Sequence, residues 1–128
     1  MLDPDTRIPE DLAALIASRF AALAEPNRVR ILDVLRREGE LSVSEIAQRL
    51  GGGYANVAKH LSLLHRERIV GRAKDGTRAV YRITDPSIAR LCDEVCGAIA
   101  QQHAELSELL AAHQVTSVAT DPDEEQHR

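Results

Sequence analysis

The sequence has 128 residues, which is room for one domain. Its 44% hydrophobic and 28% charged residues are typical of a soluble globular protein, and the scarcity of aromatic residues favours packed helices over a β-sandwich. No apolar run approaches the roughly 20 residues needed to span a bilayer, and the first residues lack the features of a secretory signal. Two cysteines are too few for a disulfide framework, so we expect a cytoplasmic protein.

Charge is distributed unevenly along the chain. The net charge of −4 at pH 7 divides into −3 for residues 1–25, +6 for residues 26–82 and −7 for residues 83–128. A basic centre can attract a polyanion although the whole chain is negative, because the local field steers the encounter. Charge alone leaves a solvated arginine-rich surface as an equally good explanation.

Helical patterns dominate the first part of the chain. Residues 1–10 contain two prolines and three acidic residues and are expected to form an N-terminal arm. A helix is predicted from Asp11, which is placed to cap it, through apolar residues at helical spacing. Pro26 suits the first turn of a second helix, which should end near Gly39. The apolar residues of this second helix are Val29, Ile31, Leu32 and Leu35.

Two further helices are predicted around a run of glycines. Ser42 and Glu45 have the spacing of a capping box and predict a short third helix that ends at the glycines of residues 51–53. The fourth helix begins near Tyr54. Its buried stripe should be Val57, Leu61 and Leu64, spaced at i, i+4 and i+7.

After the fourth helix, the spacing of apolar residues changes from a helical pattern to one typical of strands. Apolar residues at 69–70 and 79–83 flank Lys74-Asp75-Gly76-Thr77, in which Asp-Gly is a strong hairpin signal. Asp85-Pro86 opens a long last helix, and after about His113 we expect a disordered acidic tail over residues 114–128. The apolar side of this helix is Ile88, Leu91, Val95, Ile99, Leu106 and Leu109.

The predicted fold is therefore mostly α with a small β-hairpin. A short helix, a glycine turn, a longer helix and a two-stranded ribbon make a winged helix-turn-helix, which we assign to residues 11–113 as a single domain. Such a fold exposes its recognition helix for entry into a major groove about 12 Å wide. Double-stranded DNA is therefore the expected partner.

Small and polar side chains opposite the buried stripe suit close approach to bases, and the hairpin cations suit contact with phosphates or a minor groove. Arg28 and Arg30 are expected on the solvent face of the second helix instead. The predicted DNA-binding residues are Tyr54, Ala55, Asn56, Lys59, His60, Ser62, Arg66, Arg72, Lys74 and Arg78.

Four stretches of the chain resemble the ArsR/SmtB family. They are FAALAEPNRVRIL at 20–32, LSVSEIAQRLG at 41–51, NVAKHLSLL at 56–64 and GTRAVYRI at 76–83, in the family's order. The resemblance implies a homodimeric bacterial repressor with winged-helix DNA-binding heads. It also implies a dimer interface formed by the first and last helices, and release of operator DNA when a ligand binds.

The chain departs from the family pattern at three places. Where the family's best-known metal site has Cys-Val-Cys, this chain has Ser42-Val43-Ser44, and hydroxyls are poor ligands for soft metals. His103 and His113 lack acidic partners at the spacing of the family's second zinc site. The recognition helix starts with Gly53-Tyr54 in place of Ser-Gln, so the operator sequence does not carry over.

Cys92 and Cys96 are four residues apart, which places both sulfurs on one face of the last helix. They are the candidate sensor thiols. A thiophilic metal or metalloid ion could bridge Cys92 and Cys96, or oxidation or polysulfide bridging could link them. Cysteine is also a small hydrophobe, so a purely structural role is a third interpretation.

Two other function classes fit less well. A winged helix can serve protein association without binding DNA. An enzyme is disfavoured because Gly51–Gly53 lies between two helices and lacks the strand and lysine of a phosphate-binding loop, and no nucleophile–histidine set is apparent. The sequence therefore predicts a dimeric transcriptional repressor, not an enzyme, whose release from DNA is controlled at the two thiols.

Overall fold

The computed structural model describes residues 5–117, with side chains described as far as residue 112. Residues up to Arg90 form one compact unit, and the chain from Leu91 forms a second. The expected tail beyond residue 117 and the first four residues of the expected arm lie outside the described residues. Within the described part, no helix is both long and apolar enough to cross a bilayer.

Two helices open the first unit. Helix α1 spans Glu10–Leu23 and α2 spans Pro26–Glu38. The prediction that Asp11 caps α1 is wrong by two positions: it lies in the first turn and accepts a hydrogen bond from the next backbone N–H at 3.0 Å. The start of α2 is as predicted, and Glu25 caps it by accepting the backbone N–H of the residue three positions on.

The helix-turn-helix follows. Helix α3 spans Val43–Leu50 and α4 spans Tyr54–Arg66. The predicted capping box is confirmed, because the Ser42 side chain accepts from the backbone of Glu45 while the Glu45 carboxylate accepts from the backbone of Ser42. Gly51 ends α3 in the left-handed conformation that a side chain disfavours, which turns the chain sharply into α4.

The hairpin is longer and its turn tighter than predicted. Strands β2 (Val70–Asp75) and β3 (Arg78–Ile83) pair antiparallel, leaving a two-residue loop in which Gly76 has a φ of 72°. A third strand, β1 (Leu41–Ser42), pairs with β3 and gives the sheet order β1-β3-β2. A strand of two residues is too short to show the alternation of apolar and polar residues that predicts a strand, so β1 was not expected from the sequence.

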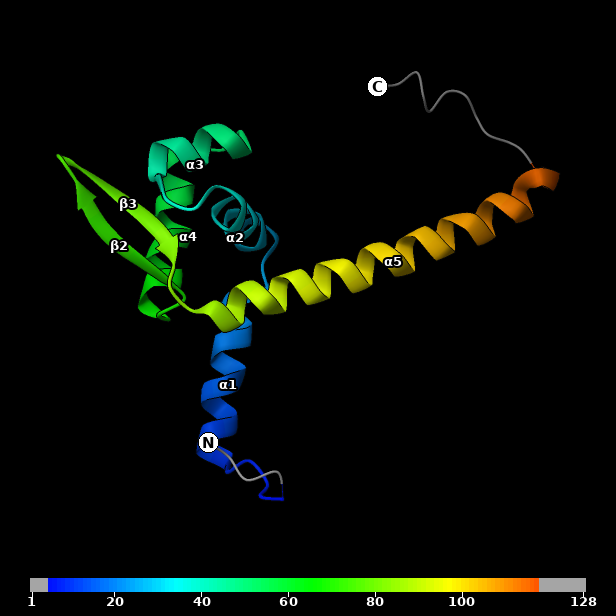
Figure 1. Cartoon of the computed structure of the whole chain (residues 1–128), viewed down its shortest axis with the longest axis horizontal. Coiled ribbons are helices and arrows are strands. Elements are labelled where there is room, and N and C mark those ends of the chain that lie inside the picture. Colours follow the sequence, from blue (N-terminus) through cyan, green and yellow to red (C-terminus); the bar gives the residue numbers. More distant parts are fainter. Residues whose placement is uncertain (1–4, 118–128) are drawn as a thin grey trace. The chain divides into compact units, whose positions relative to one another are not determined.

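The core of the first unit lies between α2, α3, α4 and the sheet. Figure 1 shows the β2–β3 hairpin beside α4, and the sheet also packs through β3 against α2 and α3. The predicted stripe of Val57, Leu61 and Leu64 is buried, as is most of the predicted apolar face of α2, although Val29 is 42% exposed. The largest fully buried side chains are Ile31, Leu32, Leu35, Ile46, Leu61, Leu64, Ile69 and Val70.

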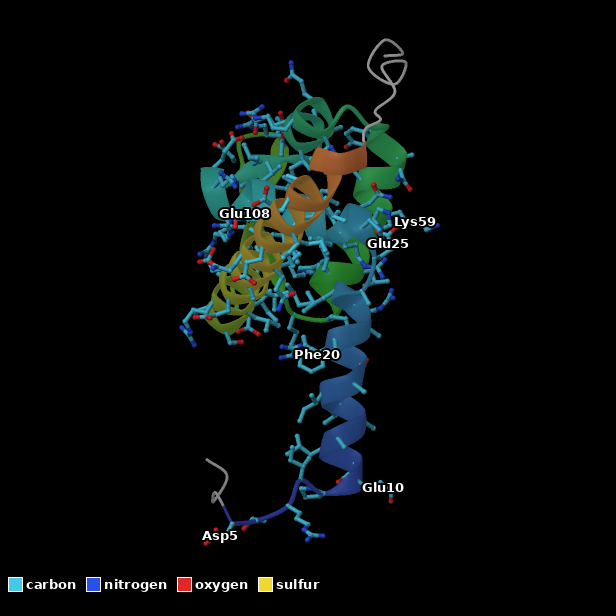
Figure 2. The ribbon with its side chains drawn as sticks, turned by 90° about the vertical axis from the view of Figure 1, so that its right-hand side faces the viewer. Asp5, Glu10, Phe20, Glu25, Lys59 and Glu108 are labelled. Atoms are coloured by element: carbon cyan, nitrogen blue, oxygen red, sulfur yellow. The ribbon has the colours of Figure 1, made fainter. Side chains whose placement is uncertain are left out.

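Two helices leave large apolar side chains in solvent. On α1, Leu15 is 69% and Phe20 is 53% exposed, and the Phe20 ring points away from the ribbon in Figure 2. Helix α5 spans Pro86–Ser117 and so continues past the predicted end near residue 113. In the second unit its exposed apolar residues are Val95, Ile99, Leu106, Leu109 and Leu110.

Candidate nucleic-acid interface

The recognition helix α4 has one buried and one exposed face. Packing of its apolar stripe onto α2 and α3 leaves the opposite face in solvent, and Tyr54 at the first position is 59% exposed. The side chains predicted to face DNA from this helix are exposed with one exception. The exposed ones are Tyr54, Ala55, Asn56, Lys59, Ser62 and Arg66.

The exception is His60, whose predicted place on the DNA-facing surface is wrong. Its exposed fraction is only 9%, and its Nδ1 lies 3.3 Å from Nη1 of Arg28 on α2. One residue after Lys59, the helix has turned about 100°, which carries His60 to the edge of the buried face. It is therefore not available to contact DNA directly.

The hairpin supplies three exposed cations. Arg72 and Lys74 are two residues apart on β2, so they project from the same face of the strand. Arg78 opens β3 and is also exposed. These positions agree with the predicted wing, although their contact with nucleic acid stays a prediction.

Arg78 already has partners within the protein. Its guanidinium lies 3.3 Å from Oε2 of Glu45 and 3.3 Å from Oδ2 of Asp75. The hydrogen bond from the backbone N–H of Ser42 lowers the pKa of Glu45 below its usual 4.5, and Arg78 lowers it further. In return, Glu45 raises the pKa of Arg78. This pair ties the wing to the first turn of α3.

Ion pairing divides the cations of the basic centre into two groups. Most arginines on α2 and α3 face a carboxylate: Arg37 lies 3.0 Å from Asp33, and Arg49 lies 2.8 Å from Glu38. Seven cations of the basic centre form no ion pair within the part of the chain that the structure describes. Three of them are Arg28, Arg30 and Arg68. The other four, which lie on α4 and β2 and are called here the open cations, are Lys59, Arg66, Arg72 and Lys74.

A shallow hollow joins the recognition helix to the wing. Its volume is about 590 Å³, and its lining includes Tyr54 from α4, Arg72 from β2, Arg78 from β3 and residues of the α3 start. The first turn of α4 and the hairpin therefore belong to one continuous surface. A backbone phosphate could approach both elements there.

The two arginines expected on the solvent face of α2 differ in their exposure to solvent. Arg30 is exposed and donates to the backbone carbonyl of Leu50 at 3.3 Å. The expectation for Arg28 is wrong, because it is half-buried: its Nε donates to the carbonyl of Ala22 at 2.6 Å and its Nη1 meets His60. A helical pattern does not reveal such a contact across 32 residues, since Arg28 and His60 lie on different elements.

Cys92 and Cys96 both lie in α5, one helical turn apart as predicted. Neither forms a disulfide within the described residues, and Cys92 is half-buried whereas Cys96 is exposed. Among the residues that the structure describes, no group of three or more His, Cys, Asp or Glu side chains is arranged to hold a metal ion. The pair therefore has no third ligand in that part of the same chain.

The order of elements, the capped helix-turn-helix and the paired strands define a winged helix-turn-helix domain. Residues 23–70 match a family model described as a helix-turn-helix domain. The transcriptional regulator KmtR of Mycobacterium tuberculosis is 33% identical over 84 residues, which cover 66% of this chain and 64% of KmtR.

Solved structures agree with this match. The antimony-specific transcriptional repressor AntR superposes with a TM-score of 0.71 at 30% identity, covering 81% of this chain and 97% of AntR. The homodimeric winged helix-turn-helix DNA-binding domain of Mb0332 from Mycobacterium bovis, described as a possible ArsR-family regulator, gives 0.67 at 31% identity and covers 81% and 94%. The chain belongs to the ArsR/SmtB family of helix-turn-helix transcriptional regulators.

Proposed function

We propose that this chain is a homodimeric repressor that binds double-stranded operator DNA. Helix α4 would enter the major groove, and the β2–β3 hairpin would lie along the adjacent backbone or minor groove. One observation carries the proposal: the open cations lie on α4 and β2, whereas the arginines at 37 and 49 are neutralised by carboxylates. Positive charge without an internal partner is available to phosphates.

The side chains of α4 suit base readout. Ala55 and Ser62 are small enough for close approach, while Asn56 and Lys59 can bond base edges. Lys59 points away from the ribbon into solvent in Figure 2. Tyr54 and Arg72, which line the same hollow, suit phosphate contacts that fix the position of α4 in the groove.

Dimerisation would cover the apolar surfaces of α1 and α5. Large exposed apolar patches on soluble proteins mark interaction sites, and α1 presents Leu15 and Phe20 beside the half-buried Leu12 and Ile16. The Mb0332 domain is described as homodimeric. Two copies related by a two-fold axis would present two α4 helices to successive major grooves, as in other helix-turn-helix dimers.

Control of DNA release is assigned to Cys92 and Cys96. Thiolates bind soft ions, and the related AntR is named as antimony-specific. The described residues supply two thiols and no third ligand, so a soft ion held there would take further ligands from outside this part of the chain, such as a second protomer. The alternative is oxidation, in which the two thiols give two electrons and two protons to an oxidant and form a disulfide. At i, i+4 spacing that bond would distort the helix.

A gel-shift titration tests DNA binding. The protein is titrated against the DNA upstream of its own coding region and against shuffled DNA of equal length, at about 50 and about 200 mM salt. We expect preference for the upstream DNA and a steep loss of affinity at the higher salt. Equal affinity for both duplexes, or affinity that ignores salt, would contradict the proposal.

A cysteine variant tests the control site. Cys92→Ser/Cys96→Ser should bind operator DNA as the parent does but resist release by arsenite or antimonite, by soft metal ions, by peroxide and by polysulfide. Release by the ions alone, or by the oxidants alone, in the parent protein decides between the two chemistries. Unchanged release of the double variant by all of them would remove the thiols from the mechanism.

A further inference from the structure

A polar cluster lies where α1, α2 and α4 meet. It consists of Glu25, Arg28 and His60, which come from two of the sequence stretches that resemble the family. The Glu25 carboxylate accepts from the backbone N–H of Arg28 at 3.0 Å, and its Oε1 lies 4.0 Å from Nε2 of His60. The Arg28 guanidinium lies between the end of α1 and His60.

Hydrogen-bond chemistry gives the direction of the contact between Arg28 and His60. A guanidinium can only donate, so in a hydrogen bond across the 3.3 Å between Nη1 of Arg28 and Nδ1 of His60 the imidazole nitrogen is the acceptor. The other ring nitrogen, Nε2, lies on the Glu25 side of the cluster.

Arg28 also donates a hydrogen bond to a backbone carbonyl at the end of α1. The carbonyl of Ala22 belongs to the last turn of that helix, where carbonyls have no partner further along the helix. Nε of Arg28 donates to it at 2.6 Å. One side chain from α2 therefore joins the last turn of α1 to the middle of the recognition helix.

His60 is buried although it is polar. Among the described residues, the buried polar side chains are Ser42 and His60, and Ser42 is explained by the cap of α3. The net contribution of one such hydrogen bond to stability is small, and an apolar side chain at position 60 would leave Nη1 of Arg28 without this acceptor. What a directional bond adds is a fixed rotation of α4 about its own axis.

We infer that His60 is a positioning residue for DNA recognition. The bond from Arg28 sets the rotation of α4, and thereby the direction of Lys59, the residue just before His60. Because Arg28 also holds the end of α1, the same bond fixes the recognition helix relative to the helix that we propose for the dimer. This inference rests on the proposed function.

The test compares His60→Leu, which removes the acceptor, with His60→Asn, whose amide oxygen takes the place of Nδ1 and can still accept from Arg28. His65→Leu is the matched control, since it makes the same change at an exposed position of the same helix. We expect His60→Leu to lose roughly tenfold in operator affinity, with unchanged affinity for shuffled DNA and an unfolding temperature only slightly below that of the parent. His60→Asn should recover most of the loss, and His65→Leu should behave as the parent.

A variant of Arg28 and a measurement without DNA separate a positioning role of His60 from a general loss of stability. Arg28→Met should lower operator affinity as His60→Leu does, and the double variant should lose no more than either single one. The backbone amide resonances of Tyr54 and Lys59 should shift in both single variants without DNA. Parent-like operator affinity and resonances in His60→Leu, or losses that track the unfolding temperature, would overturn the inference. Absence of salt-dependent binding by the parent would instead refute the proposed function.

Discussion

Lys59 and Arg37 carry the same charge in different surroundings. The Arg37 side chain is 66% exposed yet lies 3.0 Å from Asp33, whereas Lys59 has no ion-pair partner among the described residues. The net field that a phosphate meets at each site therefore differs, although the formal charges are equal. That contrast makes the pair suitable for a test of the interface.

Lys59→Ala should weaken operator binding by roughly 1–3 kcal/mol and reduce the slope of log affinity against log salt by about 1, as expected for a lost base or phosphate contact. Arg37→Ala removes the same charge from α2 and should change affinity little. Gel-shift titration at several salt concentrations measures both. Equal losses for the two variants would mean that only overall charge matters.

Arg78 must exchange partners before it can bind a phosphate, because Glu45 and Asp75 already hold it. Glu45→Gln removes the competing charge, while glutamine still serves at this position of a capping box. We expect tighter DNA binding with a parent-like unfolding temperature. If Glu45→Gln instead weakens binding as Arg78→Ala does, the role of Arg78 is to hold the wing against α3.

At the scale of elements, the helix-turn-helix was largely predictable from local rules. The capping box at Ser42 and Glu45 and the stripe of α4 depend on successive residues three or four positions apart, and both are confirmed. The contact between Arg28 and His60 was not predictable, because it depends on how two helices cross. A helical pattern says which face of α4 is buried, and it does not say what lies opposite a polar residue at the edge of that face.

The start of α5 gives a prediction for acid stability. The hydrogen bond from the Ser87 hydroxyl lowers the pKa of Asp85 below its usual 3.8, and Arg19 at 2.9 Å adds to the effect. A carboxyl whose pKa is lower in the folded state stabilises the fold above its unfolded pKa, and this contribution is lost as pH falls through the folded value. Ser87→Ala should therefore lower the unfolding temperature clearly at about pH 7 and much less at about pH 2. Equal decreases at both values would contradict this account.

At the scale of the whole molecule, the apolar surface of α1 predicts the oligomeric state. Phe20→Glu places a charge among Leu12, Leu15 and Ile16, and we expect it to shift the protein to a monomer in sedimentation analysis. Operator affinity should fall about tenfold or more, because one head then binds without the other. Ala14→Glu, on the opposite side of α1, is the matched control and should leave a dimer. A dimeric Phe20→Glu protein would show that α1 is not at the interface.

The separation of open cations from paired ones also bears on how a target site is found. Lys59, Arg66, Arg72 and Lys74 have no ion pair with any described residue to break, so we expect first attachment to any stretch of duplex to be fast and independent of sequence. A protein held only by such contacts can slide along the double helix, so its search becomes partly one-dimensional. Arg78, released from Glu45 more slowly, would then help to arrest that sliding where the bases fit.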